Sequence, residues 1–222
     1  MKTKILYEDE DILVCLKPAG LPTQTANIRQ TDLTDEIRNY LKKPYIGLVH
    51  RLDQPVEGIL VLAKNDCAAA KLSKQVQNGN MKKYYQAVTL LRTGEDIASD
   101  TLVDYLKKDS GRNLSRVVNE KQPEAKRAEL AYETLLVSET CALRRIELKT
   151  GRHHQIRVQF SHAGMPLLGD QKYGNEYSKQ LSVDKGVVDV ALCAYQLTFL
   201  HPVTCKKMEY AITPSAEIFH HF

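Results

Sequence analysis

Residues 46–63 read Ile-Gly-Leu-Val-His-Arg-Leu-Asp-Gln-Pro-Val-Glu-Gly-Ile-Leu-Val-Leu-Ala, a polar stretch between two apolar runs. The first run, residues 46–49, predicts a short strand, and the continuous run at 59–63 predicts a buried one. Residues 50–58 between them carry a histidine, an arginine and two acidic side chains, which protein cores rarely bury unless they are paired. The sequence therefore predicts a polar segment held at the end of a strand.

The rest of the chain continues this mixture of strands and helices. Apolar spacing predicts amphipathic helices at 32–43 and 66–78, and a third helix that carries residues 153–162. Further strands are predicted at 5–16 (two, around an acidic turn), 83–88, 128–136, 142–148, 191–199 and 207–212. Residues 93–124 are polar and irregular, and we expect loops around short strands there. Together these patterns predict an α+β fold with a mixed, largely antiparallel sheet flanked by helices, as a single domain over residues 1–222.

The composition is that of an ordinary folded protein. The 222 residues are 43% hydrophobic and 26% charged, which argues against disorder and against a fibrous architecture. The formal net charge of +4 permits binding to a nucleic acid without requiring it. The five cysteines have no CxxC spacing and are typical of reduced thiols, and neither a secretion signal nor a membrane-spanning segment is recognised. We therefore expect a cytoplasmic protein without membrane contact.

A second polar cluster occupies residues 151–157, Gly-Arg-His-His-Gln-Ile-Arg, and continues into the glycine-containing segment 164–174. Histidines 50, 153, 154 and 162, with the carboxylates of Asp53 and Asp170, raise the alternative of a metal-dependent hydrolase. The spacing argues against a metal site, because adjacent residues on a helix point about 100° apart and no His-Glu-x-x-His pattern occurs. We expect neither a metal nor an organic cofactor.

The two polar segments together resemble the signature regions of the RluA-type RNA pseudouridine synthases, whose first motif reads H-R-L-D-x-x-x-x-G. Further similarities follow in the family's order across nearly the whole chain: residues 13–21 with Lys17-Pro18-Ala19-Gly20, Lys83-x-Tyr85-x-Ala87, Leu192-x-Ala194 and His201-Pro202. One departure is Val56-Glu57, where many members carry Thr-Ser before the glycine. Because the catalytic-domain motifs begin near the start of the chain, no separate S4-type RNA-binding domain is expected.

The resemblance implies catalytic roles for three residues. An aspartate after a strand is usually a turn former, but the family pattern makes Asp53 the carboxylate that attacks the target nucleotide. Arg157 is then its partner, since a nearby guanidinium favours the ionised carboxylate. Tyr85 stacks on the target base in this interpretation, and its hydroxyl assists removal of the proton from C5. Whether Asp53 attacks the ribose C1′, adds to uracil C6 or promotes formation of a glycal stays open.

The resemblance also implies a substrate, uridine within structured ribosomal or transfer RNA, with its base flipped out of the stack. Arg51, Arg152 and Lys83 are the candidate RNA-binding residues, and a monomer without a nucleotide cofactor is expected. A non-catalytic RNA-binding protein on the same fold is an alternative from another class. Retention of all three catalytic candidates favours the isomerase, an RNA pseudouridine synthase, over that alternative.

Overall fold

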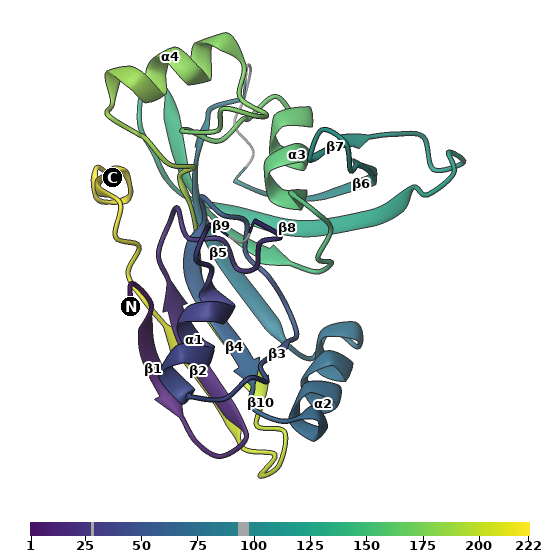
Figure 1. Ribbon diagram of the computed structural model, residues 1–222. Helices are drawn as coiled ribbons and strands as arrows, with labels where there is room; N and C mark the ends of the chain where they lie inside the picture. Colours follow the sequence, from purple (N-terminus) through teal and green to yellow (C-terminus); the bar gives the residue numbers. More distant parts are fainter. Residues whose placement is uncertain (28, 93–97) are drawn as a thin grey trace. The chain divides into compact units, whose positions relative to one another are not determined.

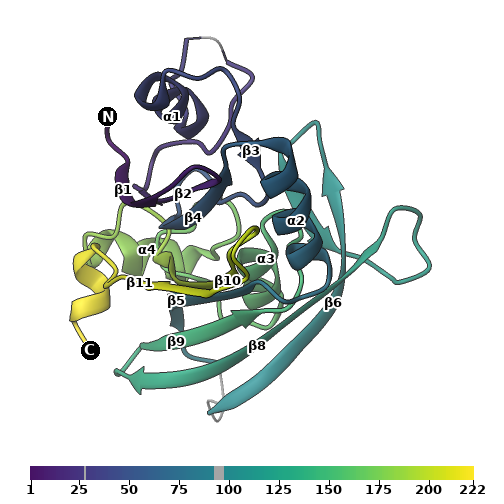
Figure 2. The same cartoon turned by 90° about the horizontal axis from the view of Figure 1, so that it is seen from below.

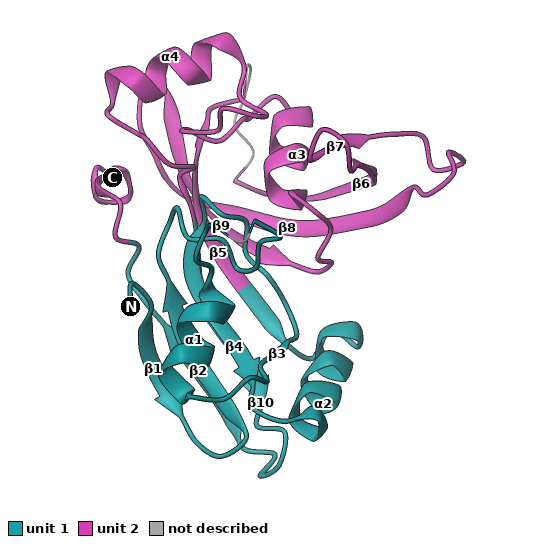
Figure 3. Cartoon of the chain, viewed as in Figure 1, with its two compact units in different colours: residues 1–83, 193–214 teal, residues 84–192, 215–222 magenta. Residues whose placement is uncertain are grey.

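The computed structural model describes residues 1–222 except residue 28 and residues 93–97 (Figure 1). The chain forms two compact units. The first comprises residues 1–83 and 193–214, and the second comprises residues 84–192 and 215–222 (Figure 3). Each unit combines sheet strands with two α-helices among its described residues. The expectation of a single domain over residues 1–222 stays a prediction.

Six strands belong to the sheet of the first unit. They neighbour one another in the order β1, β2, β4 and β10, while β3 lies against β4 and β11 against β10. Their bounds are Lys4–Glu8 (β1), Ile12–Lys17 (β2), Gly47–Leu48 (β3), Glu57–Ala63 (β4), Leu192–Leu200 (β10) and Lys207–Ala211 (β11). The β4–β10 pair is parallel and the other pairs are antiparallel. Because Lys17 pairs with Gly58, the end of β2 lies beside the chain that enters β4.

The helices of the first unit, α1 (Leu33–Leu41) and α2 (Asp66–Gln77), confirm two predictions. Their N-caps are Asp32 and Asn65, and each side chain accepts the N–H of the residue three positions later. Helix α2 packs on one face of the sheet through Ala68 and Leu72. The buried residues of this core are Ile12, Val14, Ile59, Val61, Ala63, Ala68, Leu72, Met81, Leu197 and Phe199.

The strands of the second unit form an antiparallel run in the order β5, β9, β8, β6 and β7 (Figure 2). Their bounds are Lys82–Leu90 (β5), Ser99–Asp109 (β6), Leu114–Val117 (β7), Lys126–Val137 (β8) and Cys141–Leu148 (β9). Helix α3 (Gln155–His162) packs against β6 and β8, because Val158 lies in a small core with Leu106 and Ala128. Helix α4 (Glu176–Asp184) and a 3-10 helix, η1 (Glu217–His220), complete the unit.

The structure confirms the predicted α+β class with a largely antiparallel sheet and corrects three local predictions. Residues 93–124 are not mainly loops: β6 alone spans eleven residues, although residues 93–97 of that prediction lie outside the described residues. Helix α3 begins at Gln155 and not at residue 153, and helix α4 was not predicted. No helix in the described parts of the chain is both long and apolar enough to cross a membrane.

Candidate active site

His50 connects β3 to the predicted nucleophile. Its Nε2 atom accepts a hydrogen bond from the main-chain N–H of Val61 at 3.2 Å, so the side chain continues the pairing that β3 begins with β4. Burial, together with the positive charge of Lys83, lowers the pKa of His50 to about 3. The imidazole is therefore neutral near pH 7, as an acceptor at Nε2 requires. This contact holds the chain against β4 three residues before Asp53.

A buried lysine holds the chain on the other side of the nucleophile. The side chain of Lys17 is fully buried, and its Nζ atom donates to the carbonyl oxygens of Pro18 (2.9 Å), Leu21 (2.7 Å) and Gln54 (3.1 Å). The Gln54 carbonyl also accepts the N–H of Gly20 at 2.9 Å, and the Gln54 side-chain amide donates to the Gly20 carbonyl at 3.1 Å. The residue after the nucleophile is therefore tied to the turn that follows β2.

Asp53 itself lies between these two supports with a partly exposed side chain. Its main-chain carbonyl oxygen accepts the N–H of Val56 at 3.1 Å, so the chain makes a β-turn directly after Asp53. The side chains of residues 51–53 alternate in exposure: Arg51 is exposed, Leu52 is buried and Asp53 is partly exposed. The local fold thus keeps both polar side chains out of the core that buries Leu52.

The glycine of the first motif is required by the packing of β4 against β10. Gly58 has φ +154°, and a Cβ atom at this position would lie 2.4 Å from the Cβ of Ala194, its partner in the parallel ladder. The preceding residue, Glu57, occupies the position that departs from the family pattern and pairs with Cys193. Burial, and then the Glu57 carboxylate, raise the pKa of the Cys193 thiol. The departure thus places an acidic side chain next to Cys193 at the start of β4, and Val56, its other residue, is buried.

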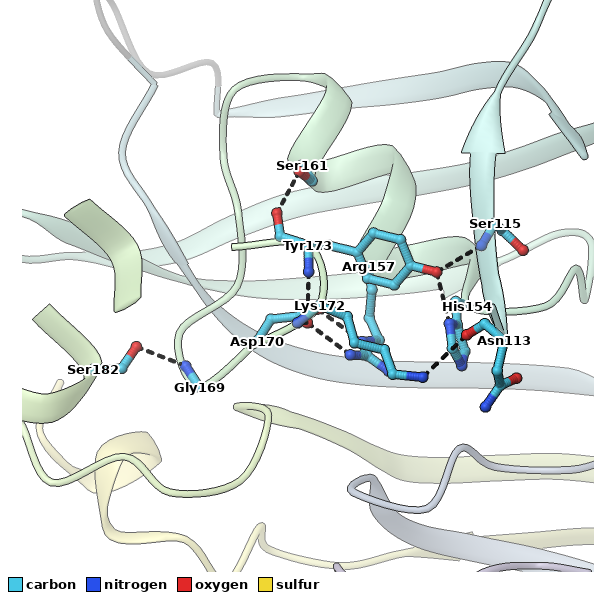
Figure 4. A network of polar contacts seen from close by, with 10 residues as sticks. All are labelled: Asn113, Ser115, His154, Arg157, Ser161, Gly169, Asp170, Lys172, Tyr173 and Ser182. Carbon is cyan, nitrogen blue, oxygen red and sulfur yellow. Dashed lines mark hydrogen bonds and ion pairs between the residues drawn. The ribbon is translucent and has the colours of Figure 1, made fainter. Parts of the chain in front are cut away.

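Arg157 is held by an acidic partner within its own unit (Figure 4). Its Nε and Nη2 atoms donate to the two carboxylate oxygens of Asp170 at 2.7 and 2.6 Å, in a bidentate pair in which the residues are 3% and 2% exposed. Asp170 also accepts the N–H groups of Lys172 and Tyr173, both at 3.0 Å. Asp170 is named from the sequence as a carboxylate in the alternative of a metal site, and this ion pair was not predicted. The guanidinium is thereby fixed in place.

The two adjacent histidines precede helix α3 and do not lie on it. His154 has φ +54°, so the helix starts after it, and its ring stacks on that of His153 with centroids 3.7 Å apart. The argument that a helix points these rings about 100° apart was therefore wrong. Gln155 supports the helix start instead, since its Oε1 atom accepts from the Arg152 N–H at 2.9 Å and the Thr150 hydroxyl at 2.8 Å.

Both histidines contribute to hydrogen bonds that join this turn to β7, and Figure 4 shows the contact of His154. The Tyr173 hydroxyl accepts the N–H of Ser115 at 2.8 Å and lies 2.7 Å from Nδ1 of His154. Burial, followed by the charge of Arg157, lowers the pKa of His154 to about 3, so this ring is neutral near pH 7. His153 has protein partners at both ring nitrogens, the Ser115 hydroxyl at 2.9 Å and the side-chain oxygen of Asn113 at 3.0 Å. These contacts give the histidines a structural role.

Among the described residues, one group has histidine and carboxylate atoms close enough to hold a metal ion: Asp9, Asp11 and His201. The Nδ1 atom of His201 accepts the N–H groups of Val203 (3.2 Å) and Thr204 (3.1 Å). Its Nε2 atom therefore carries the proton and donates to Asp9 at 2.8 Å. A protonated Nε2 is not a metal ligand, so the group is explained by hydrogen bonds within the first unit.

Tyr84 and Tyr85 are adjacent on β5, so their side chains lie on opposite faces of the strand. Tyr85 is 5% exposed and pairs with Ile146, whereas the ring of Tyr84 lies under the guanidinium of Arg145, with 4.5 Å between the ring centroid and Cζ. Burial lowers the pKa of Lys83, the residue before them. A lysine in this setting is less suited to binding phosphate at the surface than an exposed one.

The predicted site residues are distributed over both units. Asp53, Arg51 and Lys83 belong to the first unit, and the second contains Tyr85, Arg157 and Arg152. Arg152 is exposed, and its Nε atom donates to the carbonyl of residue 127 at 2.9 Å. The expected pairing of Arg157 with Asp53 stays a prediction. Chemically, the first unit supplies a supported carboxylate and the second a fixed arginine and a buried tyrosine.

Two solved structures share this fold over nearly the whole chain. Human RNA Pseudouridylate Synthase Domain Containing 4 has a TM-score of 0.77 and 23% identity, over 98% of this chain and 90% of that chain. Human RNA Pseudouridylate Synthase Domain Containing 1 has a TM-score of 0.76 and 21% identity, and the match covers 98% of this chain and 86% of that chain. These matches show that the chain shares the fold of these two proteins.

Sequence comparison then gives the family. Residues 11–162 match the family model described as RNA pseudouridylate synthase, and the chain belongs to this family. An uncharacterized RNA pseudouridine synthase of Aquifex aeolicus is 34% identical over 94% of this chain and 68% of its own length. Ribosomal large subunit pseudouridine synthase D of Haemophilus influenzae is 31% identical over 93% of this chain and 65% of its own length. The chain thus spans about two thirds of the length of these curated relatives.

Proposed function

We propose that the protein is an RNA pseudouridine synthase that converts uridine in structured RNA to pseudouridine, with Asp53 as nucleophile. Family membership supports the reaction. The observation that carries the role of Asp53 is its setting: a partly exposed carboxylate whose flanking main chain is held by His50 on one side and by Lys17 and Gly20 on the other. Such support pre-organises a reacting group.

One carboxylate is sufficient for this chemistry. A glycosidase needs a second acid or base to handle the leaving group and water, whereas an isomerase returns the same uracil to the same sugar. The N1–C1′ bond to the ribose breaks, a bond forms between C1′ and C5 of uracil, C5 loses a proton and N1 gains one. The reaction is balanced without an oxidant, a metal or an organic cofactor.

Arg157 and Tyr85 complete the proposed catalytic set. A guanidinium has five N–H donors in a fixed plane, and the Asp170 pair uses its Nε and Nη2 edge. In the proposed mechanism Arg157 also faces the Asp53 carboxylate and keeps it ionised. The ring of Tyr85 stacks on the extruded uracil, and its hydroxyl takes part in removal of the C5 proton.

Ribosomal RNA is the favoured substrate class, since a 31% identical relative carries the name ribosomal large subunit pseudouridine synthase D. Arg51 and Arg152 are exposed and supply the proposed phosphate contacts, with the partly exposed Lys83 as a third cation. We propose that the protein acts as a monomer in the cytoplasm.

The test is incubation of purified protein with a transcript of the large-subunit ribosomal RNA of its source organism, and with its transfer RNA. Pseudouridine is then measured by mass spectrometry of the nucleosides. Asp53→Asn is the matched control, because it keeps the size of the side chain and removes its charge. We expect it to lose activity by on the order of 10⁴-fold or more while still binding RNA.

The alternatives give different results in the same assay. A non-catalytic RNA-binding protein would bind the transcript and form no pseudouridine. A metal-dependent hydrolase would lose activity in a chelator, whereas the proposed isomerase keeps it. An Asp53→Asn protein with wild-type activity would overturn the assignment of the nucleophile.

A further inference from the structure

Thr23 makes two hydrogen bonds to the residue that precedes Asp53. It is 2% exposed, in the loop between β2 and α1, and lies 29 positions before Leu52 in the sequence. Its Oγ1 atom donates to the Leu52 carbonyl oxygen at 2.7 Å and accepts the Leu52 N–H at 3.2 Å. One hydroxyl therefore satisfies both main-chain polar groups of a residue that is itself 7% exposed.

The first of these bonds acts on the peptide group that carries Asp53. A peptide group is planar, so the direction of the Leu52 carbonyl also fixes the orientation of the Asp53 nitrogen. On the other side, the Asp53 carbonyl accepts the N–H of Val56 at 3.1 Å. Both peptide planes next to Asp53 are thus hydrogen-bonded, which restricts its φ and ψ angles and with them the direction of its Cα–Cβ bond.

We propose that Thr23 is a positioning residue, which aims the Asp53 carboxylate at the nucleotide by fixing the peptide group before it. The inference rests on the proposed role of Asp53 as nucleophile. Thr23 does not touch the substrate in this proposal, and its effect reaches the reaction through the main chain. A displacement of a reacting group by about 1 Å lowers a rate by on the order of 10²-fold, so a lost peptide anchor acts on turnover more than on RNA binding.

The test compares Thr23→Val with Thr23→Ser. Valine keeps the shape of threonine and removes the hydroxyl, whereas serine keeps the hydroxyl and removes a methyl group. We expect Thr23→Val to lower kcat by about 10-fold to 10²-fold with KM for a large-subunit ribosomal RNA transcript unchanged within about twofold. Thr23→Ser should restore kcat to within about threefold of wild type, because both hydrogen bonds can form again.

The outcomes separate this inference from the function on which it rests. Wild-type kcat in Thr23→Val, with an inactive Asp53→Asn protein, overturns the role of Thr23 alone. Activity in Asp53→Asn overturns the proposed nucleophile and the positioning role with it. An equal rise of KM and fall of kcat/KM in Thr23→Val, with kcat unchanged, also contradicts positioning.

Hydrogen exchange keeps the proposal testable if Thr23→Val does not fold. In the wild-type protein the Leu52 amide should exchange far more slowly than an unstructured amide, because its partner is a buried hydroxyl. Exchange of this amide at the unstructured rate overturns the proposal. Thr101→Val is the matched comparison, since it makes the same substitution at an exposed position of β6, and we expect at most a threefold change in kcat.

Discussion

The two units hold their candidate catalytic residues in different ways. Around Asp53, the supports act on the main chain of neighbouring residues: His50 binds β4, and Lys17 and Gly20 bind Gln54. In the other unit, the Arg157 side chain itself is held, by a buried bidentate pair with Asp170 (Figure 4). The position of the carboxylate thus depends on backbone geometry, whereas the position of the arginine depends on a charge.

This difference predicts two kinds of failure. Loss of a main-chain support near Asp53 leaves the charges of the site unchanged and should lower turnover while the protein stays folded. Loss of the Asp170 carboxylate removes the ion pair that holds the buried Arg157 guanidinium, which should lower both stability and turnover. The predictions below test this contrast, beginning with the largest effect.

Asp170→Asn should produce the largest combined effect. Removing one partner of a buried ion pair costs about 3–5 kcal/mol of unfolding free energy, because the other charge stays buried. Displacement of Arg157 should also lower kcat by about 10²-fold. Urea denaturation and steady-state kinetics measure the two effects. Asp184→Asn, an exposed aspartate at the end of α4, is the control and should change neither.

The double variant Asp170→Asn with Arg157→Met sharpens this prediction. Replacement of a buried ion pair by uncharged side chains is often neutral for stability, so much of the lost free energy should return. Activity should not return, because the proposed partner of Asp53 is absent. Recovery of activity in the double variant would contradict the proposed role of Arg157, and full activity of Arg157→Ala would do the same.

Tyr85→Phe should have the next largest effect, a loss of turnover with little change in the stability of the fold. Phenylalanine keeps the buried ring that β5 needs and removes the hydroxyl proposed to assist departure of the C5 proton. General acid–base assistance contributes about 10²-fold or more, so kcat should fall by at least about 10²-fold. Tyr84→Phe is the matched control and should retain activity within about twofold, since Tyr84 lies under Arg145 on the opposite strand face. Equal activity of the two variants would exclude the hydroxyl from the mechanism.

Local sequence patterns were sufficient to predict the elements that bury continuous apolar faces. The run at 59–63 gave β4, and the periodic apolar residues at 32–43 and 66–78 gave α1 and α2, which begin after Asp32 and Asn65. Strand β6 was missed because most of its side chains are exposed or partly exposed, and it is held by main-chain pairing with β8 from Ser99 to Leu106. Pairing of this kind leaves little trace in a hydrophobic pattern.

The supports of the candidate site were less predictable than its central residues. Asp53 and Arg157 lie in recognisable motifs, but the partners that hold them are distant in sequence or part of other turns. Thr23 contacts a residue 29 positions away, and Asp170 contacts one 13 positions away. Which donors and acceptors meet across such distances is decided by the path of the chain. The same limit explains the error at His154, whose positive φ no spacing rule indicates.

Acid should destabilise both units through their buried imidazoles. The pKa of His50 and that of His154 are both lowered to about 3, from the ordinary histidine value of 6.5. Below about pH 6.5 the unfolded chain takes up protons that the folded protein does not bind until about pH 3. Stability should therefore fall as the pH decreases through this window, by up to about 1.4 kcal/mol per pH unit for each imidazole.

His50→Gln separates the contribution of the first unit. The glutamine Oε1 atom can accept the Val61 N–H in place of Nε2 but does not titrate. Urea denaturation between pH 7.5 and pH 5 should show a shallower loss of stability for this variant than for wild type. The same pH dependence in both proteins would contradict the neutral, buried state of His50.

The smallest effect is expected for Arg152→Ala, which tests whether the second unit contributes a phosphate contact. Arg152 is exposed and bound to a main-chain carbonyl through Nε alone, so its removal should leave folding unchanged. Loss of one phosphate contact weakens RNA binding at all sequences and lowers the slope of log affinity against log salt by about one. Fluorescence anisotropy of labelled RNA across a salt series measures this slope. Lys71→Ala, an exposed lysine on α2 with no assigned role, is the control. A slope that changes equally in both variants would mean that Arg152 acts through general surface charge, and the phosphate contact would then be sought at Arg51.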